Sequence, residues 1–188
     1  MISLSTLTVR HDATIDGVNV ENCTYDQIKD IKLSNGESLP TLDAILVELK
    51  KSRDTKLVLE FKTHNAVEKN NRVVDISMEL IKEAGLSDMV DYIAFDYNIC
   101  KRIIANDPNA FVGYLNGDKA PSTVLADGIR CIDYSSINLA VSPAWLKEAK
   151  EIGVLVNVWT VNTTNDMLKW IEKGVDFITT DHPDILQT

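Results

Sequence analysis

Basic residues are scarce in this sequence relative to acidic ones. It contains 19 Lys and Arg against 28 Asp and Glu, which gives a net charge of −9. The few cations are dispersed and form no basic face, so we expect no nucleic-acid partner. The same charge repels anionic ligands at long range. An anionic substrate therefore needs a local cation, either a metal ion or a focused Lys or Arg.

Long apolar runs and cysteine frameworks are also lacking. No run approaches the roughly 20 residues of a membrane span, and residues 1–10 lack the basic start of a signal peptide. Cys23, Cys100 and Cys131 show neither metal-site nor disulfide spacing, so buried thiols are expected. These absences predict a soluble, cytoplasmic protein without a membrane span, and they leave open whether a longer parent is exported.

Apolar segments alternate with amphipathic helical segments from residue 57 onward. Six segments have the length and composition of buried strands: 57–61, 92–95, 111–115, 129–134, 154–161 and 175–179. Between them, apolar residues recur at helical spacing, and Ser142 and Pro143 predict a helix start as N-cap and first helical residue. This repeating pattern predicts a parallel sheet with right-handed crossovers.

The region before residue 57 has a different pattern. Residues 7–10 predict a strand or hairpin arm, residues 13–39 are polar and turn-rich, and residues 41–50 have the apolar spacing of a helix. Six βα units fit an open doubly wound sheet or part of an eight-stranded barrel. No Gly-x-Gly-x-x-Gly or Walker-type loop follows any strand, which disfavours a nucleotide-binding open sheet.

The length of the chain favours an incomplete barrel. A complete barrel usually takes about 200 residues or more, and this chain falls short by about two βα units. We therefore predict an α/β fold of the (β/α)8 TIM-barrel type, incomplete at the N-terminus. It has about six βα units and an N-terminal hairpin and helix region, in a single domain over residues 1–188.

Five short motifs occur in order along the chain. They are His11-Asp12-Ala-Thr-Ile-Asp16, Leu39-Pro-Thr-Leu42, Leu59-Glu-Phe-Lys62, Val158-Trp-Thr-Val-Asn162 and Gly174-Val-Asp-Phe-Ile-Thr-Thr-Asp-His-Pro183. In this order and spacing they resemble the glycerophosphodiester phosphodiesterase family, a TIM-barrel group of metal-dependent phosphodiesterases. The resemblance extends from His11 to Pro183, over nearly the whole chain.

The resemblance implies roles for four residues. His11 resembles a general acid that protonates the departing alkoxide, a task that suits an imidazole near neutral pH. Glu60 resembles a ligand of Ca²⁺ or Mg²⁺, which prefer oxygen donors. Lys62 lies on the same side of its strand and would hold a phosphate oxygen, and Trp159 would pack beside the substrate. The structural alternatives are a loop histidine, a surface ion pair and a core tryptophan.

The resemblance also implies missing parts. Family members open with a His-Arg-Gly motif and a Glu-x-Asp pair, which this chain lacks, so the first catalytic histidine and two of three metal carboxylates are absent. The strand count, made independently, also finds about two βα units missing. The segment Glu21-Asn22-Cys23-Thr24 echoes another family motif, but it lies in the wrong order and is expected to form a turn.

Three functional hypotheses follow. The first is a phosphodiesterase that cleaves glycerophosphodiesters to an alcohol and glycerol 3-phosphate. We expect weak or no activity from this chain, because Glu60 alone would bind a divalent metal (Ca²⁺ or Mg²⁺) weakly or not at all. The second is a non-catalytic family member, a binding module or a homodimer formed through the incomplete barrel edge. The third is an unrelated α/β-barrel enzyme.

Overall fold

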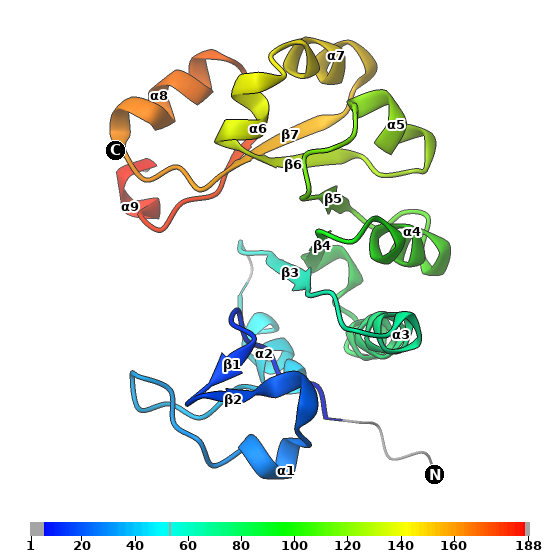
Figure 1. The fold of residues 1–188 in the computed structure, drawn as a ribbon, viewed down its shortest axis with the longest axis vertical. Helices are drawn as coiled ribbons and strands as arrows, with labels where there is room; N and C mark the ends of the chain where they lie inside the picture. The colour runs from blue at the N-terminus through cyan, green and yellow to red at the C-terminus, as the bar shows by residue number, and fades with distance from the viewer. Residues whose placement is uncertain (1–5, 53, 187–188) are drawn as a thin grey trace. The chain divides into compact units, whose positions relative to one another are not determined.

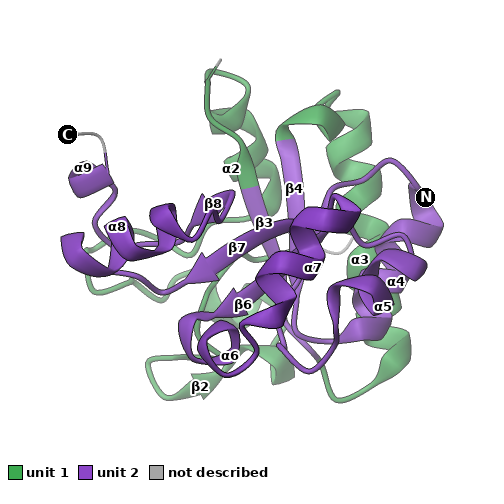
Figure 2. Ribbon diagram, turned by 90° about the horizontal axis from the view of Figure 1, so that it is seen from above, with its two compact units in different colours: residues 1–57, 64–89 green, residues 58–63, 90–188 purple. Residues whose placement is uncertain are grey.

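The computed structural model of the protein describes residues 6–52 and 54–186. Its contacts divide the chain into two compact units (Figure 2). Unit 1 comprises residues 1–57 and 64–89, and unit 2 comprises residues 58–63 and 90–188. The expectation of a single domain over residues 1–188 stays a prediction.

Unit 2 is built on a curled sheet of six strands in sequence order (Figure 1). The strands are β3 (Leu57–Phe61), β4 (Val90–Ala94), β5 (Val112–Tyr114), β6 (Cys131–Ser135), β7 (Leu155–Trp159) and β8 (Phe177–Ile178). The neighbouring pairs from β4 to β8 are parallel. This half-barrel confirms the prediction of an incomplete TIM-barrel-type fold. The ends of β3 are as expected, and those of the other strands differ by one or two residues from the expected ones.

The central strands are buried on both faces. Every residue of β5 is buried, as are four of the five residues of β6. Successive side chains of a strand point to opposite sides, so such strands need apolar side chains on both. This explains why the sequence shows continuous apolar runs here, as parallel sheets do, rather than strict alternation.

The helices of unit 2 lie between its strands or after the last strand. They are α4 (Tyr97–Asn106), α5 (Pro121–Ala126), α6 (Ser136–Val141), α7 (Ala144–Ile152), α8 (Thr164–Glu172) and α9 (Pro183–Leu186). Side-chain caps fix three of their starts. At α6 the Ser135 hydroxyl accepts from the Asn138 N–H at 3.1 Å. The Asp96 carboxylate accepts from the Asn98 N–H at 2.8 Å, and the Thr163 hydroxyl accepts from the Asp166 N–H at 3.2 Å.

The predicted start of the helix at residue 142 is wrong by one residue. Ser142 ends α6, where its N–H donates to the Asn138 carbonyl, so Pro143 is the residue that caps α7. The short helices α5 and α6 were not predicted, because segments of six residues carry little periodic signal.

Unit 1 contains the strands and helices that precede β4, apart from β3. They are β1 (Thr14–Ile15), β2 (Val18–Asn19), the 3₁₀ helix η1 (Val20–Asn22), α1 (Tyr25–Ile28), α2 (Leu42–Leu49), α3 (Val67–Glu83) and the 3₁₀ helix η2 (Ser87–Met89). One small core cluster of unit 1 consists of Ile15, Ile28 and Leu39. The β1–β2 turn at Asp16 and Gly17 has positive φ at both residues, as two-residue hairpin turns require.

The structure corrects two expectations in unit 1. Residues 7–10 form no strand, because only Thr8 makes an isolated bridge, to Thr41, and the hairpin lies at residues 14–19. The expected turn at residues 21–24 is a 3₁₀ helix, followed by Thr24 as the N-cap of α1. The helix expected over residues 41–50 is confirmed as α2, which Thr41 caps.

Two further features bear on the sequence expectations. Cys100 and Cys131 are buried, Cys23 is partly exposed, and all three are free thiols. Across the described residues, no helix combines the length and the apolar character that crossing a bilayer requires.

Gly117 and Gly153 allow a test of packing in unit 2. Both have positive φ, but an added Cβ would lie 1.6 Å from Asn138 Nδ2 at Gly117 and would meet nothing within 4 Å at Gly153. We expect Gly153→Ala to lower the free energy of unfolding by about 1–2 kcal/mol through backbone strain alone. Gly117→Ala should cost a further ~1–3 kcal/mol through overlap with Asn138.

Urea unfolding of the two variants beside the wild type gives this comparison. Equal losses in the two variants would show that the Asn138 side chain moves aside without cost and would contradict the prediction.

Candidate active site

Glu60 and Lys62 lie at the carboxyl end of β3. Lys62 Nζ is 2.6 Å from Glu60 Oε1, so the two side chains point to the same side of the strand, as predicted. The side chains are 20% exposed for Glu60 and 40% exposed for Lys62. The ammonium has three donors, so it retains hydrogen-bonding capacity for an anion while it contacts the carboxylate.

A row of polar side chains crosses β6 and β7 and reaches the end of β8. Asp133 and Asn157 are paired in register on adjacent strands, and both are buried. The Asn157 amide donates to Asp133 Oδ1 and, at 2.8 Å, to the Thr179 hydroxyl. One amide thus links three segments of chain that are far apart in the sequence.

The Asp133 carboxyl occupies space that a glycine leaves open. A Cβ added to Gly113 on β5 would lie 3.2 Å from Asp133 Cβ and 3.6 Å from Asp133 Oδ2. Burial raises the pKa of Asp133 to about 6, the Asn157 hydrogen bond opposes this, and the charge of Glu60 raises it further. The protonation of Asp133 therefore changes near neutral pH.

Trp159 ends β7 beside this row. Its indole Nε1 donates to the backbone carbonyl of Asp133 at 2.8 Å, and its ring meets Phe95 edge-on at a centroid distance of 5.8 Å. The side chain is partly buried rather than enclosed in the core. A tryptophan fixed at its polar edge, with part of its surface exposed, suits a wall beside a ligand.

The ends of β7 and β8 are tied together by Asn162. Its side-chain oxygen accepts from the Asp181 N–H at 2.9 Å and from the Thr180 hydroxyl at 3.1 Å, and its amide donates to Asp181 Oδ2 at 2.7 Å. Asp181 therefore binds Asn162 through both its backbone and its side chain. These bonds fix the position of the chain that follows Trp159.

His11 belongs to unit 1 and lies before the β1–β2 hairpin. Its side chain is 83% exposed, and Nδ1 is 3.1 Å from Asp12 Oδ1. Arg10 Nη2 lies 3.5 Å from the other carboxylate oxygen of Asp12. A carboxylate on Nδ1 leaves Nε2 as the ring nitrogen available for proton transfer.

A family model and solved structures of known proteins both match this chain. The model of the glycerophosphoryl diester phosphodiesterase family matches residues 5–185. The chain is 40% identical to a glycerophosphodiester phosphodiesterase from Parabacteroides distasonis, with a TM-score of 0.93, over 96% of this chain and 76% of that one. The chain belongs to the glycerophosphoryl diester phosphodiesterase family. No curated protein matches the sequence.

More distant members of the family share the fold. A putative glycerophosphoryl diester phosphodiesterase from Silicibacter pomeroyi is 22% identical with a TM-score of 0.78, over 89% of this chain and 67% of that one. An Oleispira antarctica phosphodiesterase, solved with its product sn-glycerol-3-phosphate, is 15% identical with a TM-score of 0.80, over 96% and 79%.

The described residues of this phosphodiesterase family member do not form a metal centre. Among them, no three His, Cys, Asp or Glu side chains gather in a way that could hold an ion. Ca²⁺ and Mg²⁺ take six or more oxygen ligands, and the one predicted ligand, Glu60, is already in contact with an ammonium. A divalent ion would need donors beyond this set.

The sequence analysis did not identify two polar groups, Asp133 and His64. A carboxylate inside the apolar run 129–134 is itself a signal of a functional or structural site. The His64 side chain is only 22% exposed, and its Nδ1 lies 3.5 Å from Glu21 Oε1. Burial and the charge of Lys69 lower the pKa of His64.

Replacing Asp133 tests the buried carboxyl. The folded protein holds this proton up to about pH 6, whereas the unfolded chain releases it near the ordinary value of 3.8. The folded state thus binds more protons between these values, and its stability falls as the pH rises through them. By pH 7 the free energy of unfolding has lost the contribution of Asp133, which is about 3 kcal/mol at 1.36 kcal/mol per pKa unit.

Asp133→Asn keeps an oxygen that accepts from Asn157 but carries no charge at any pH. We expect the variant to gain about 3 kcal/mol of unfolding free energy relative to wild type between pH 4 and pH 7. Urea unfolding of both proteins at several pH values measures this difference. The contributions of the other titrating groups are the same in both proteins and cancel in the comparison. A difference that does not change with pH would contradict the raised pKa.

Proposed function

We propose that this chain carries part of a site for the hydrolysis of glycerophosphodiesters to an alcohol and glycerol 3-phosphate. The observation that carries the proposal is the Glu60–Lys62 pair at the carboxyl end of β3, in a member of this family. Ligands of parallel α/β folds bind at the carboxyl ends of the strands. In a chain with a net charge of −9, Lys62 is a local cation that attracts a phosphodiester to this edge.

The proposed roles of the residues follow from their chemistry. The Lys62 ammonium binds a phosphate oxygen and offsets the charge that develops on it during attack by water at phosphorus. The Trp159 ring packs beside the substrate. The attacking water forms the new phosphorus–oxygen bond and releases a proton to solvent. As the bond to the leaving oxygen breaks, His11 supplies a proton to the departing alkoxide, which leaves as the alcohol, and His11 regains a proton from solvent. Glu60 holds Lys62 in place and contributes one oxygen to the site.

We further propose that the 188-residue chain alone hydrolyses glycerophosphodiesters slowly or not at all. The resemblance assigns a second histidine and two further carboxylates to the family's reaction, and the sequence contains no His-Arg-Gly or Glu-x-Asp motif. Loss of one acid–base group typically costs about 10²–10⁴-fold in rate. Loss of most of the oxygen donors weakens the binding of Ca²⁺ or Mg²⁺ as well.

Hydrolysis of glycerophosphocholine by the purified chain tests both proposals. The choline released would be measured with Ca²⁺, with Mg²⁺ and with a chelator, beside the isosteric variant Glu60→Gln. We expect no turnover above that of the variant. Metal-dependent turnover that Glu60→Gln abolishes would support the phosphodiesterase site and contradict the proposal of an inactive chain.

Binding of glycerol 3-phosphate tests the anion site independently of turnover. We expect Lys62→Gln to weaken binding by about tenfold or more, because the ammonium is the proposed phosphate ligand. Lys51→Gln is the matched control, since Lys51 also contacts a glutamate, Glu48, at 2.7 Å, but it follows the end of α2 and its side chain is exposed. Calorimetry would contradict the assignment if both variants bound like wild type, or if both lost affinity equally.

The edges of the sheet favour one alternative, a non-catalytic dimer. β3 and β8 are the outer strands of the six-stranded sheet, and Val58 on β3 and Phe177 on β8 are about half exposed. Unpaired strand edges with exposed apolar side chains favour association with a second chain. Light scattering at several concentrations tests this, and a mass of one chain at all of them would exclude the dimer.

A further inference from the structure

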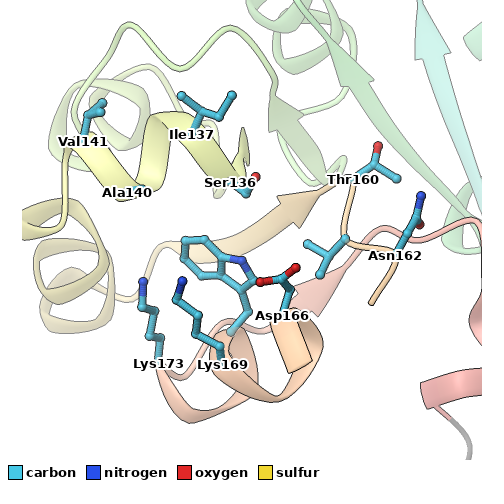
Figure 3. A pocket seen from close by; sticks show the side chains of 11 residues that line it. Ser136, Ile137, Ala140, Val141, Thr160, Asn162, Asp166, Lys169 and Lys173 are labelled. Carbon is cyan, nitrogen blue, oxygen red and sulfur yellow. The ribbon is translucent and has the colours of Figure 1, made fainter. Parts of the chain in front are cut away.

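A groove of about 320 Å³ lies in unit 2, between α6 and α8 (Figure 3). Its walls come from these two helices and from the chain that follows β7. The lining residues that matter here are Ile137, Ala140 and Val141 on one side, and Lys169, Trp170 and Lys173 on the other. The volume lies at the lower end of the range of small-molecule sites.

The α8 side of the groove is cationic. Lys169 and Lys173 are one helical turn apart, and their side chains run parallel in Figure 3. Lys173 Nζ lies 4.1 Å from the centroid of the Trp170 ring, a cation–π contact. Within residues 6–52 and 54–186, no carboxylate forms an ion pair with either lysine. Two positive charges are thus concentrated here in a strongly acidic chain.

Asp166, which also lines the groove, does not cancel this charge at the lysines. Its carboxylate accepts from the Thr163 hydroxyl at 2.8 Å, and the Thr163 oxygen accepts from the Asp166 N–H, so the two residues form the N-terminal cap of α8. In Figure 3 the Asp166 carboxylate lies apart from the ammonium groups of Lys169 and Lys173. The cationic end and the capped end of the groove are therefore distinct.

The α6 side of the groove is apolar. Ile137 and Val141 are one turn apart and are 73% and 76% exposed, the two highest values among the large apolar residues of the described chain. Trp170, which is 4% exposed, also lines the groove and contacts Lys173 Nζ through its ring. Exposed aliphatic side chains beside two cations match a ligand that carries both an anionic and an apolar part.

We propose that this groove binds an anionic amphiphile, a small molecule with one acidic head and a hydrocarbon tail. The head lies between the ammonium groups of Lys169 and Lys173, and the tail covers Ile137, Ala140 and Val141. A free anion would leave the apolar wall in water, and exposed lysines alone hold an anion weakly. An anionic bilayer is disfavoured, because the net charge of −9 repels an extended negative surface.

Calorimetry on the whole 188-residue chain tests the proposal without any need for turnover. The probe is dodecyl phosphate, kept below its micelle-forming concentration. Inorganic phosphate represents the head alone and dodecyl maltoside the tail with a neutral head. We expect dodecyl phosphate to bind at least tenfold more tightly than either. Equal affinity for inorganic phosphate, or for the maltoside, would overturn the proposal.

Variants locate the binding. Lys169→Gln with Lys173→Gln, and separately Ile137→Ser with Val141→Ser, should each weaken binding of dodecyl phosphate at least tenfold. The matched controls are Lys147→Gln with Lys150→Gln on α7, and Leu168→Ser with Ile171→Ser on α8. They remove the same charge and the same kind of exposed apolar side chain outside the groove lining, and should bind like wild type.

Two outcomes contradict the assignment to this groove. One is unchanged binding in both groove variants while their circular dichroism and melting temperature match the wild type. The other is co-sedimentation with vesicles of phosphatidylglycerol and phosphatidylcholine in the absence of binding to monomeric dodecyl phosphate, which would identify a membrane surface instead. Failure of the glycerophosphocholine assay has no bearing on either, since the groove residues are not those proposed for hydrolysis.

Discussion

The double donation by the Asn157 amide is the interaction on which the candidate site depends. It joins Asp133 on β6 and Thr179 after β8 to β7, and the neighbouring Trp159 indole is held by the Asp133 carbonyl. Asp133 and Asn157 are buried, so their polar groups must find partners within the protein. The arrangement fixes the spacing of three strands and the orientation of the tryptophan together. A carboxyl with a pKa near 6 in this row makes that order sensitive to pH.

Electrostatics sets the second constraint on function. A chain with a net charge of −9 attracts an anion only where cations are concentrated. In the described structure, lysine side chains provide such a local positive charge at two places. Lys62 is held by one glutamate at a strand end, where a phosphodiester is proposed to bind. Lys169 and Lys173 lie beside exposed aliphatic side chains and an indole, where a head and a tail are recognised together.

Much of the fold could be predicted because parallel strands and long helices leave strong periodic patterns. β3 was predicted with its observed ends, and α2 within one residue of each end. The short helices α5 and α6 were not predicted, and the start of α7 was misplaced because Ser142 serves the end of the preceding helix. In the candidate site, the motifs identified Glu60, Lys62 and Trp159, whose roles remain predictions. The Asp133–Asn157 pair was not predicted, because its two residues are 24 positions apart in the sequence.

The sequence by itself determined the type of fold, the family and the acidic character of the chain. Strand and helix periods are local, and the family motifs are short strings that keep their order, so both can be read without coordinates. Only the tertiary structure decided which polar groups meet. The strand register placed Asp133 opposite Asn157, Gly113 left room for the carboxyl, and α6 and α8 together formed a groove. Burial and pairing are properties of distant segments brought together, and no local pattern encodes them.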